Sequence, residues 1–579
     1  MSTDAAAAVE PQATRPAEPG PAATRPSAEQ PPAPASFTGA RWLMVAVVVG
    51  YLIHVAWRLW LVRDFIAPAA HADEDGYLVA ARALAGGHGG FSTENTAFRR
   101  TGYPLLLSPI YWFTSEAFQV YRGAQIINAC LNALVFPLAA LFASRVLGMP
   151  RRWAVGVGFT AAAMPAVVFY SGLAMPDAII ATIGLSWLML IHTWLTAAST
   201  GGRGAAGIGA AAIVGVAYTV HVRGTMLVMV HCALLLALLL LRKIRLVTAA
   251  VTAAAMVGVA ALDPVLKAVL GDAIMLVGRS PKSDTLHSIT TITGFLRTMA
   301  GVGGQVWYMS VGTWGVGAIG LVALIMPLLN LADVRRRLAD RAEAGALITQ
   351  LVALVATALI AAGSAASLPP VDHRINYFAY PRYTHFMFPI WFMIGVAALR
   401  VYGPRLRMRV AGGVAAGMLV FGVLLKLRTG RAKGFRFMAF DAPETSFLSW
   451  NWTHIQITIP TVLAVLLLAG VVLAHLRHRT TVAALVAILA LNAVVASTVV
   501  HQVIRPMVVN QYVATTPRLI EDLHLGPDDV VAELWQTPFP IPYNHMREIT
   551  WQRLLIFSDG EAPPAEATVV IGPWHPTRP

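Results

Sequence analysis

Long apolar runs, separated by short polar segments, dominate the sequence between residues 41 and 503. Each run is close to or above the roughly 17–25 apolar residues that a helix needs to cross a bilayer. The runs lie at 41–62, 104–147, 152–173, 177–198, 205–222, 225–241, 246–266, 306–331, 344–366, 385–400, 410–427, 456–475 and 480–503. This pattern predicts an all-α polytopic membrane protein with about thirteen transmembrane helices.

The start of the chain departs from this pattern. Residues 1–40 are rich in Pro, Ala, Thr and Glu and show no apolar period, which predicts a disordered cytoplasmic tail. Because no apolar core lies near the beginning, we expect the first span to be retained as a membrane helix and not removed as a secretory signal. Residues 41–504 then form the transmembrane domain.

The end of the chain changes character after residue 505, where turn signals and short β-rich segments replace the apolar runs. The expected elements are a short helix at Pro517–Leu525, a turn at Gly526-Pro527, and strands at Val530–Leu534, Thr550–Ser558 and Ala567–Ile571. These elements predict that residues 505–579 form a small α/β module.

The charge distribution sets the expected orientation. The chain is 57% hydrophobic and 12% charged, and its formal net charge is +14. Short loops rich in Lys and Arg stay in the cytoplasm, so we interpret the basic excess as topology and not as nucleic-acid binding. Six basic clusters fall at alternate loops: Arg145/Arg151/Arg152, Arg203, Arg242/Lys243/Arg245, Arg335/Arg336/Arg337/Arg341, Arg400/Arg405/Arg407/Arg409 and Arg477/Arg479. A cytoplasmic N-terminus places all six inside and, with an odd number of spans, the C-terminus outside.

The same orientation places a defined set of segments on the outer face. They are the first outer loop at 63–103, the turns Ser171–Asp177 and His221–Arg223, the loops 267–305, 367–384 and 428–455, and the tail from 505. The two cysteines, Cys130 and Cys232, lie inside apolar runs, so we expect neither a disulfide framework nor a cysteine metal site.

The first outer loop holds three adjacent carboxylates, Asp73, Glu74 and Asp75, in a chain with only 29 acidic residues among 579. Tyr77, Ala81 and Leu84 follow at three- and four-residue spacings, which predicts a short amphipathic helix at the membrane surface. Carboxylates at its start would be favoured by the helix dipole. The acids therefore either cap a surface helix or carry chemistry.

A resemblance favours chemistry. The loop carries Asp73-Glu-Asp-Gly-Tyr77, then Ala81-Arg82, then Gly86-Gly87, and ends with Arg99-Arg-Thr-Gly-Tyr103-Pro. Over about 35 residues it resembles the first outer loop of the GT-C glycosyltransferases, in particular the bacterial relatives of protein mannosyltransferases and of the lipid A aminoarabinose transferase. Members often have two acids where this chain has three, and often Pro where it has Thr101. The resemblance implies a GT-C-like fold in which Tyr77 and Tyr103 contact substrate. Arg99 and Arg100 lie near the same surface and either bind the phosphate of the substrate or anchor a helix.

The chemistry of an outer-face transferase can also be stated from the residues. No nucleotide pool exists outside the cell, so the sugar donor must be linked to a polyprenyl phosphate or pyrophosphate. A carboxylate can take the proton of the attacking acceptor hydroxyl, and arginines can hold the departing phosphate bidentately. We expect Asp73 to be the base, with Glu74 positioning the acceptor or sharing that role.

Asp177 follows a turn at the outer start of a span. It either supports the N-terminus of that helix or acts as a second acid beside Asp73. The resemblance supports the second reading, because many GT-C enzymes carry an acid at a comparable turn. A divalent cation held by Asp73 and Asp177 is conceivable from their hard oxygen ligands, but nothing in the sequence requires a cofactor.

The segment 370–389 is polar, aromatic and basic between two spans. Its Arg382-Tyr383 resembles the Arg-Tyr element before a late span in this family, which makes Arg382 the first choice for the donor phosphate and His373 and Arg374 weaker ones. The alternative is an interfacial aromatic belt with an anchoring arginine. Arg223, at an outer turn, would be costly in lipid unless it faces a cavity, so it is a second phosphate candidate.

These residues predict an inverting hexosyl- or pentosyltransferase in the plasma (inner) membrane of a bacterium. It would move a sugar from a polyprenyl phosphate to an outer-face acceptor, whether glycan, lipid or protein. Two other classes stay open. A transporter or flippase of lipid-linked saccharides would carry ionisable residues deep within its spans and two related halves. A non-catalytic partner in envelope assembly would depend on the C-terminal module and not on the acids.

Overall fold

The computed structural model describes residues 37–93, 100–271, 273–277, 285–368, 378–429, 438–475, 478–513, 519–537, 540–549 and 552–572. The chain divides into two compact units, residues 1–46 and 47–579, and every contact given below lies within the second. The main helices are α1 Phe37–Leu61, α4 Ala117–Ala133, α5 Val135–Arg145, α6 Arg151–Ala162, α7 Pro165–Val168, α8 Asp177–Thr196, α9 Thr200–Val220, α10 Gly224–Leu240, α11 Leu246–Ala260, α12 Leu262–Leu270, α14 Ile292–Gly312, α15 Val316–Leu328, α17 Arg341–Ser367, α18 Phe388–Val401, α19 Pro404–Thr429, α22 Thr458–Ala474 and α23 His478–Val499.

Among the described residues, eight helices are long and apolar enough to cross a membrane, or up to ten if each of two bent pairs is one span. Three shorter apolar helices lie at Gly224–Leu240, His385–Val401 and Thr458–Ala474. Every apolar run predicted from the sequence contains one of these helices. The all-α multi-pass class is thus confirmed, whereas the count of about thirteen spans stays a prediction because the short helices fall below the usual spanning length.

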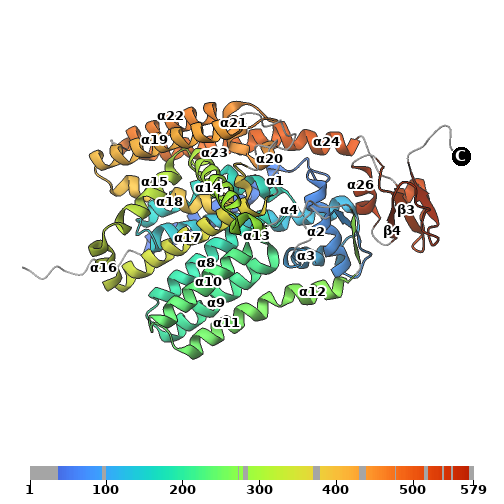
Figure 1. The fold of residues 1–579 in the computed structure, drawn as a ribbon, viewed down its shortest axis with the longest axis horizontal. Helices are drawn as coiled ribbons and strands as arrows, with labels where there is room; N and C mark the ends of the chain where they lie inside the picture. Colours follow the sequence, from blue (N-terminus) through green and yellow to red (C-terminus); the bar gives the residue numbers. More distant parts are fainter. Residues whose placement is uncertain are drawn as a thin grey trace, which may run out of the picture. The chain divides into compact units, whose positions relative to one another are not determined.

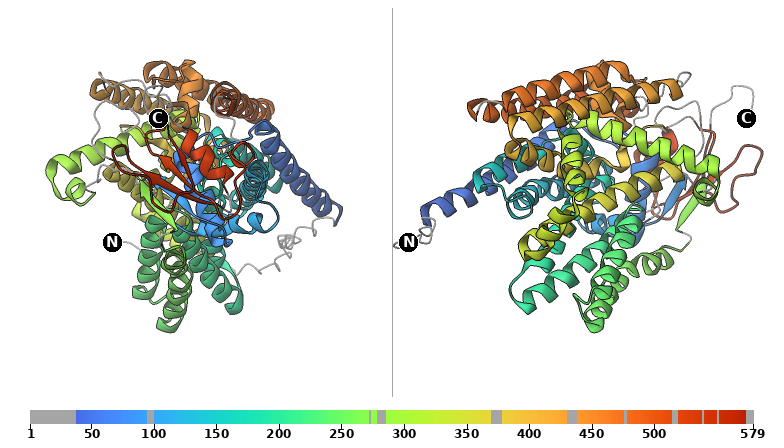
Figure 2. Two further views of the ribbon diagram at one scale, coloured as in Figure 1. Left: turned by 90° about the vertical axis from the view of Figure 1, so that its right-hand side faces the viewer. Right: turned by 60° about the vertical axis from the view of Figure 1, so that its left-hand side comes forward.

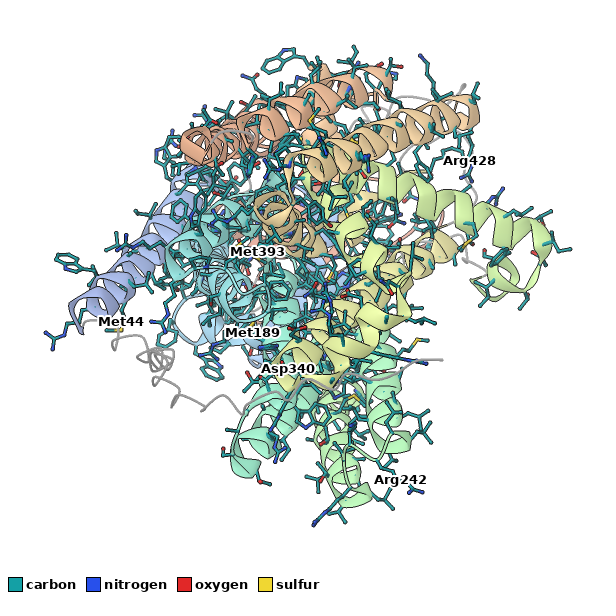
Figure 3. The ribbon with its side chains drawn as sticks, turned by 90° about the vertical axis from the view of Figure 1, so that its left-hand side faces the viewer. Met44, Met189, Arg242, Asp340, Met393 and Arg428 are labelled. Carbon is teal, nitrogen blue, oxygen red and sulfur yellow. The ribbon has the colours of Figure 1, made fainter. Side chains whose placement is uncertain are left out.

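The helices pack in neighbouring groups. Figure 1 shows α8, α9, α10 and α11 side by side, with α19, α22 and α23 grouped elsewhere. Figure 3 looks onto the end of the helices opposite α2, and it labels Arg242 after α10 and Asp340 before α17. The charge pattern places the loops of both residues on one side of the membrane, and this orientation stays a prediction.

A buried arginine holds a break between two helices. Arg58 of α1 donates to Asn132 Oδ1 at 2.7 Å and to the carbonyl oxygen of Ala162 at 2.9 Å. Ala162 is the last residue of α6, before the chain bends by 60° into α7. Asn132 in turn donates to carbonyl oxygens of Val167 and Ala178. Because broken helices leave carbonyls unpaired, these side chains stabilise the bend that leads the chain toward α8.

The first outer loop forms the helix α2 (His71–Leu84), the strand β1 (Gly90–Thr93) and the short helix α3 (Gly102–Leu107). β1 pairs in parallel with β2 (Ile274–Val277), so this loop is joined to the loop that follows α12. The loop is thus a folded element and not a solvated connection.

The C-terminal residues form a small parallel sheet of order β4-β3-β5. The strands are β3 (Val530–Leu534), β4 (Arg553–Phe557) and β5 (Val569–Ile571), each inside a segment predicted as a strand. The helix α25 (Leu519–Asp522) lies in the predicted helical segment, and α26 (Ile541–Glu548) connects β3 to β4. α26 contacts α2 (Figures 1 and 2), which puts the first outer loop and the C-terminal residues on the same side. The division into domains at residue 505 stays a prediction.

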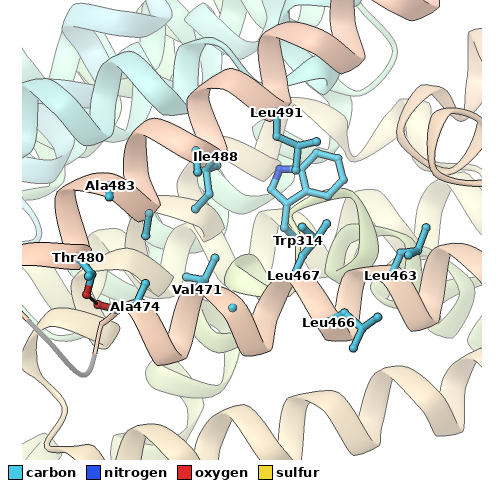
Figure 4. A pocket seen from close by; sticks show the side chains of 13 residues that line it. Trp314, Leu463, Leu466, Leu467, Val471, Ala474, Thr480, Ala483, Ile488 and Leu491 are labelled. Atoms are coloured by element: carbon cyan, nitrogen blue, oxygen red, sulfur yellow. Dashed lines mark hydrogen bonds between the residues drawn. The ribbon is translucent and has the colours of Figure 1, made fainter.

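An apolar groove of about 680 Å³ lies between α22 and α23 (Figure 4). Trp314, Leu467, Val471 and Ile488 are among the residues that line it. The indole of Trp314 donates to Asn492 Oδ1 at 2.8 Å. The groove offers no ionisable side chain for chemistry, so the candidate site has to be sought among the charged residues near α2.

Candidate active site

α2 begins at the acidic cluster, as the sequence predicts. Successive residues of an α-helix project about 100° apart around its axis, so three neighbouring side chains cannot enter one site. Asp73 faces the later outer segments, Glu74 faces the turn before α8, and Asp75 lies 2.9 Å from His71 on α2 itself. The three carboxylates therefore have three different environments.

Four charged side chains form a continuous row of ion pairs, in the order Asp73, Arg382, Asp177 and Arg223. Arg382 Nη1 lies 2.7 Å from Asp73 Oδ2, and its Nη2 lies 3.2 Å from Asp177 Oδ2. Arg223 Nη2 lies 2.6 Å from Asp177 Oδ1. The four residues come from α2, from the 3₁₀ turn η4 (Pro381–Tyr383), from the start of α8 and from the residue before α10. We call these four residues the ion-pair row.

The Asp73 end of the ion-pair row is accessible to solvent, and the Arg223 end is buried. The side chain of Asp73 is 31% exposed and that of Arg382 is 12% exposed, whereas Asp177 and Arg223 are 2% and 4% exposed. Asp177 stands in the first turn of α8, where the helix dipole favours a negative charge. The buried pair thus forms the floor of the site, and Asp73 is the carboxylate that a molecule from outside can reach.

Aromatic rings flank both arginines. The guanidinium of Arg382 lies 5.1 Å from the ring centre of Phe440 and 5.9 Å from that of Tyr170, and Arg223 lies 4.6 Å from that of Tyr383. Burial alone would lower the pKa of Arg382, yet Asp177 and Asp73 together raise it well above its ordinary value. Arg382 is therefore a permanent cation at a partly open position.

Two predicted tyrosines border the row. Tyr77 is buried and meets Tyr103 edge-on, with ring centres 5.4 Å apart. Burial raises the pKa of Tyr77 well above its ordinary value, and the nearby charges of Asp177 and Asp73 raise it further. Tyr103 donates its hydroxyl to Asn128 Oδ1 at 3.0 Å. Both phenols stay neutral and both rings are buried, so they pack beside the ion-pair row without adding charge to it.

Glu74 is fully buried and all of its partners are donors. Its Oε1 accepts the backbone N–H groups of Ala69 and Ala70, both at 2.9 Å. Its Oε2 accepts the Tyr121 hydroxyl at 2.8 Å and the backbone N–H of Ala174 at 2.7 Å. Burial raises the pKa of Glu74, and these hydrogen bonds oppose the shift. Contact of Glu74 with an acceptor does not fit this environment; the side chain fixes the turns on either side of it.

Arg100 lies apart from the row. Its Nη1 pairs with Asp263 Oδ2 at 2.9 Å, and its guanidinium stacks on Tyr218 at 3.7 Å. Asp263 Oδ1 also accepts the backbone N–H and the hydroxyl of Thr101, both at 2.9 Å. Arg100 is thus engaged in joining the loop to α12, which is the anchoring role that the sequence left open. Arg99, His373 and Arg374 lie outside the described residues.

The position of Arg382 also concerns whether Asp73 and Asp177 could hold a divalent cation. Its guanidinium is bonded to both Asp73 and Asp177, where a cation shared by these carboxylates would have to lie. In the part of the chain that the structure describes, no group of three or more His, Cys, Asp or Glu side chains gathers to hold a metal ion. The two carboxylates are therefore satisfied by arginine.

The sequence gives little sign of a further buried acid, Glu444, near the site. Glu444, in α21 (Pro443–Ser449), is fully buried and accepts the Tyr308 hydroxyl at 2.8 Å. His385 Nε2 lies 3.8 Å from the same oxygen, and its Nδ1 lies 3.3 Å from the Tyr170 hydroxyl. Burial raises the pKa of Glu444 to about 7. Nothing in the local sequence distinguishes Glu444 from an ordinary surface acid, because its contacts with Tyr308 and His385 come from distant segments. Sequence reasoning therefore missed it.

The two acids Asp73 and Glu74 should respond differently to amide substitution. In Glu74→Gln the new NH₂ group meets two donors in either orientation, so we expect a loss of about 1–3 kcal/mol in unfolding free energy. Asp73→Asn weakens a partly exposed ion pair and should cost less than about 1 kcal/mol. Thermal unfolding in detergent measures both. Equal destabilisation by the two substitutions would contradict this division.

Glu444 should make stability depend on pH. Its folded pKa is raised from 4.5 to about 7, so the folded protein holds a proton that the unfolded chain releases. This contribution to stability is full below pH 4.5 and is lost as the pH rises to about 7. Glu444→Gln should therefore raise the unfolding temperature relative to wild type at pH 8 and leave it unchanged at pH 5. If the unfolding temperatures of wild type and Glu444→Gln follow parallel curves against pH, this prediction is wrong. Glu566→Gln, at an exposed acid, is the control.

Of three comparisons with known proteins, one finds similar proteins, among the solved structures. No family model and no curated protein matches the sequence. Among solved structures the chain is similar to ArnT from Cupriavidus metallidurans bound to undecaprenyl phosphate, with 14% identity over 91% of this chain and 87% of that chain and a TM-score of 0.48. The apo state of the same enzyme gives 17% identity over 90% and 86% and a TM-score of 0.48. The function proposed below rests on the chain's own site.

Proposed function

We propose that this protein is a membrane glycosyltransferase that moves a sugar from a polyprenyl phosphate to an acceptor on the outer face of a bacterial plasma membrane. The observation that carries the proposal is the ion-pair row, in which the accessible carboxylate of Asp73 lies 2.7 Å from the guanidinium of Arg382. A base and a phosphate-binding cation side by side are what transfer from a phosphate leaving group requires.

The reaction is an inverting displacement. The acceptor oxygen forms a bond to the anomeric carbon while the bond from that carbon to the phosphate oxygen breaks. The acceptor hydroxyl gives its proton to Asp73, and the electron pair of the broken bond stays on the phosphate, next to Arg382. Because Asp73 is partly exposed, its proton passes to water after transfer. Glycan, lipid and protein acceptors all offer the required hydroxyl.

Donor binding would rearrange the row. Arg382 is shared between Asp73 and Asp177 when no phosphate is present. A phosphate oxygen that accepts a hydrogen bond from Arg382 Nη1 takes the place of the Asp73 carboxylate. Asp177 still accepts from Nη2 of the same guanidinium. Asp73 then becomes a free base only when the donor is in place. Arg223 keeps Asp177 fixed from below, at 2.6 Å, and need not touch the phosphate.

The outer acids therefore take different roles. Asp73 acts on the acceptor, and Asp177 aligns Arg382 and Arg223. Glu74 holds the start of α2 to the turn before α8, in place of the acceptor contact expected from the sequence. Tyr383, half-buried beside Arg223, supplies an aromatic surface on which a sugar ring can pack, whereas Tyr77 and Tyr103 are buried and pack against each other.

The first test of this function is a transfer assay with a panel of polyprenyl-phosphate sugars. Asp73→Asn should lower kcat by about 10²–10⁴-fold, the usual contribution of a general base, with folding intact. Asp64→Asn is a matched control, because Asp64 lies in the same loop and its side chain is 34% exposed. Full activity of a folded Asp73→Asn protein would refute the proposal, as would the absence of transfer from every donor.

A second test concerns Arg382. Lysine keeps the charge but cannot bridge a phosphate and Asp177 with one planar group. Arg382→Lys should raise the KM for the lipid-linked donor about tenfold, equivalent to about 1.4 kcal/mol. The acceptor KM should change little. Arg63→Lys, at an exposed arginine near the end of α1, is the control. An unchanged donor KM in Arg382→Lys would exclude Arg382 from phosphate binding.

A further inference from the structure

The last turn of α2 carries a buried arginine whose partners are all backbone carbonyls. Arg82 Nε donates to His88 O at 2.7 Å, and its Nη2 donates to Gly89 O at 2.6 Å. Its Nη1 donates to Met546 O at 2.8 Å and to Ile549 O at 2.5 Å. Arg82 is 2% exposed. One side chain thus joins α2, the turn after it and a segment more than 460 positions later.

Arginine suits this position for two physical reasons. Its planar guanidinium carries five N–H donors in fixed directions. Each of its three nitrogens donates to a backbone carbonyl oxygen, and these carbonyls lie on three sides of the group. Met546 and Ile549 lie at the C-terminal end of α26, where unpaired carbonyls and the helix dipole both favour a cation. Among the described residues Arg82 makes no ion pair with a carboxylate, and this helix end stabilises its buried charge in addition to the more distant charge of Asp75.

The neighbouring sequence is shaped for the same contact. A Cβ added to Gly89 would lie 1.5 Å from the carbonyl oxygen of Ala273, and one added to Gly90 would lie 2.7 Å from Met546 Sδ. Because neither residue has a side chain, the backbone can approach Ala273, before β2, at Gly89 and Met546 of α26 at Gly90. The ring of His71, at the other end of α2, lies 5.7 Å from that of Tyr543 on α26. Both ends of α2 therefore touch α26.

Two fixed points set the direction of a helix. Glu74 fixes the first turn of α2, but a helix that is held at one point can still change its direction about that point. Asp73 projects about 100° from Glu74 around the axis, so a small rotation of α2 changes where Asp73 points. Arg82 lies eight residues beyond Glu74, or about 12 Å at 1.5 Å per residue, and provides the second fixed point.

We infer that α26 and the strands beside it are a structural part of the active site, and that Arg82 is the positioning residue through which they hold Asp73 against Arg382. The inference rests on the proposed function, because it assigns to Arg82 an effect on the base of that reaction. Arg82 touches no substrate; it acts through the direction of α2. The C-terminal residues would then be needed for the chemical step and not only for binding a partner.

The test compares Arg82→Lys with the control Arg553→Lys in the full-length protein. Arg553 lies on β4 of the same sheet and makes an exposed ion pair with Glu566. Lysine at position 82 keeps the charge but cannot reach carbonyls on three sides. For the folded, monodisperse fraction of Arg82→Lys we expect kcat to fall by roughly 10–100-fold, the effect of a displacement of about 1 Å, with the donor KM within about twofold of wild type.

Hydrogen–deuterium exchange supplies a readout that does not depend on activity. Amides of His71–Leu84 should exchange faster in Arg82→Lys, and the control should match wild type in both measurements. Unchanged exchange of α2, or a normal kcat in the folded variant, would overturn the inference. If wild type transfers sugar from no donor, the proposed function fails by itself, and faster exchange in Arg82→Lys still establishes that Arg82 holds α2.

Discussion

Asp73 and Arg382 are 309 positions apart in the sequence, yet their side chains meet at 2.7 Å. This ion pair is the contact on which the site depends, because it joins the first outer loop to the turn before α18. Partly exposed ion pairs contribute little to stability by themselves. Here the pair is backed by Asp177 and Arg223, which are almost fully buried and hold Arg382 from the other side. Removal of Asp177 would leave the buried charge of Arg223 without its carboxylate, which is costly, whereas loss of Asp73 leaves Arg382 paired with Asp177.

The geometry of α2 explains how one short helix serves several purposes. Three consecutive acids on a helix must diverge, and each meets a different surface of the protein. One acid is accessible and faces an arginine, one is enclosed by four donors, and one pairs with a histidine on the same helix. The helix is held at its first turn by Glu74 and at its last turn by Arg82. The proposed base Asp73 stands directly beside the first of these fixed points on a helix whose direction is set by both, and such positioning is the requirement for preorganised chemistry.

Much of the architecture was predictable because it depends on local sequence. Apolar runs mark the helices, the acidic cluster marks the start of α2, and the short β-rich segment Val530–Leu534 after a turn signal marks a strand. The types of residue in the site were predictable from chemistry, so Asp73, Asp177, Arg223 and Arg382 could be named before their contacts were known. What the sequence did not contain was the pairing between distant residues. Nothing local distinguishes Arg100, which binds Asp263, from Arg382, nor shows that Glu74 is enclosed while Asp73 is open. The roles of Arg82, Tyr170 and Glu444 likewise follow only from their neighbours in space.

We expect the donor phosphate and Asp73 to compete for the guanidinium of Arg382. The most direct measurement is a structure of the protein with a polyprenyl phosphate bound. We expect the phosphate oxygens within hydrogen-bonding distance of Arg382, the pair between Arg382 and Asp177 kept at about its present 3.2 Å, and the Asp73 carboxylate released. A phosphate bound elsewhere, with Asp73 and Arg382 still paired at 2.7 Å, would contradict the account.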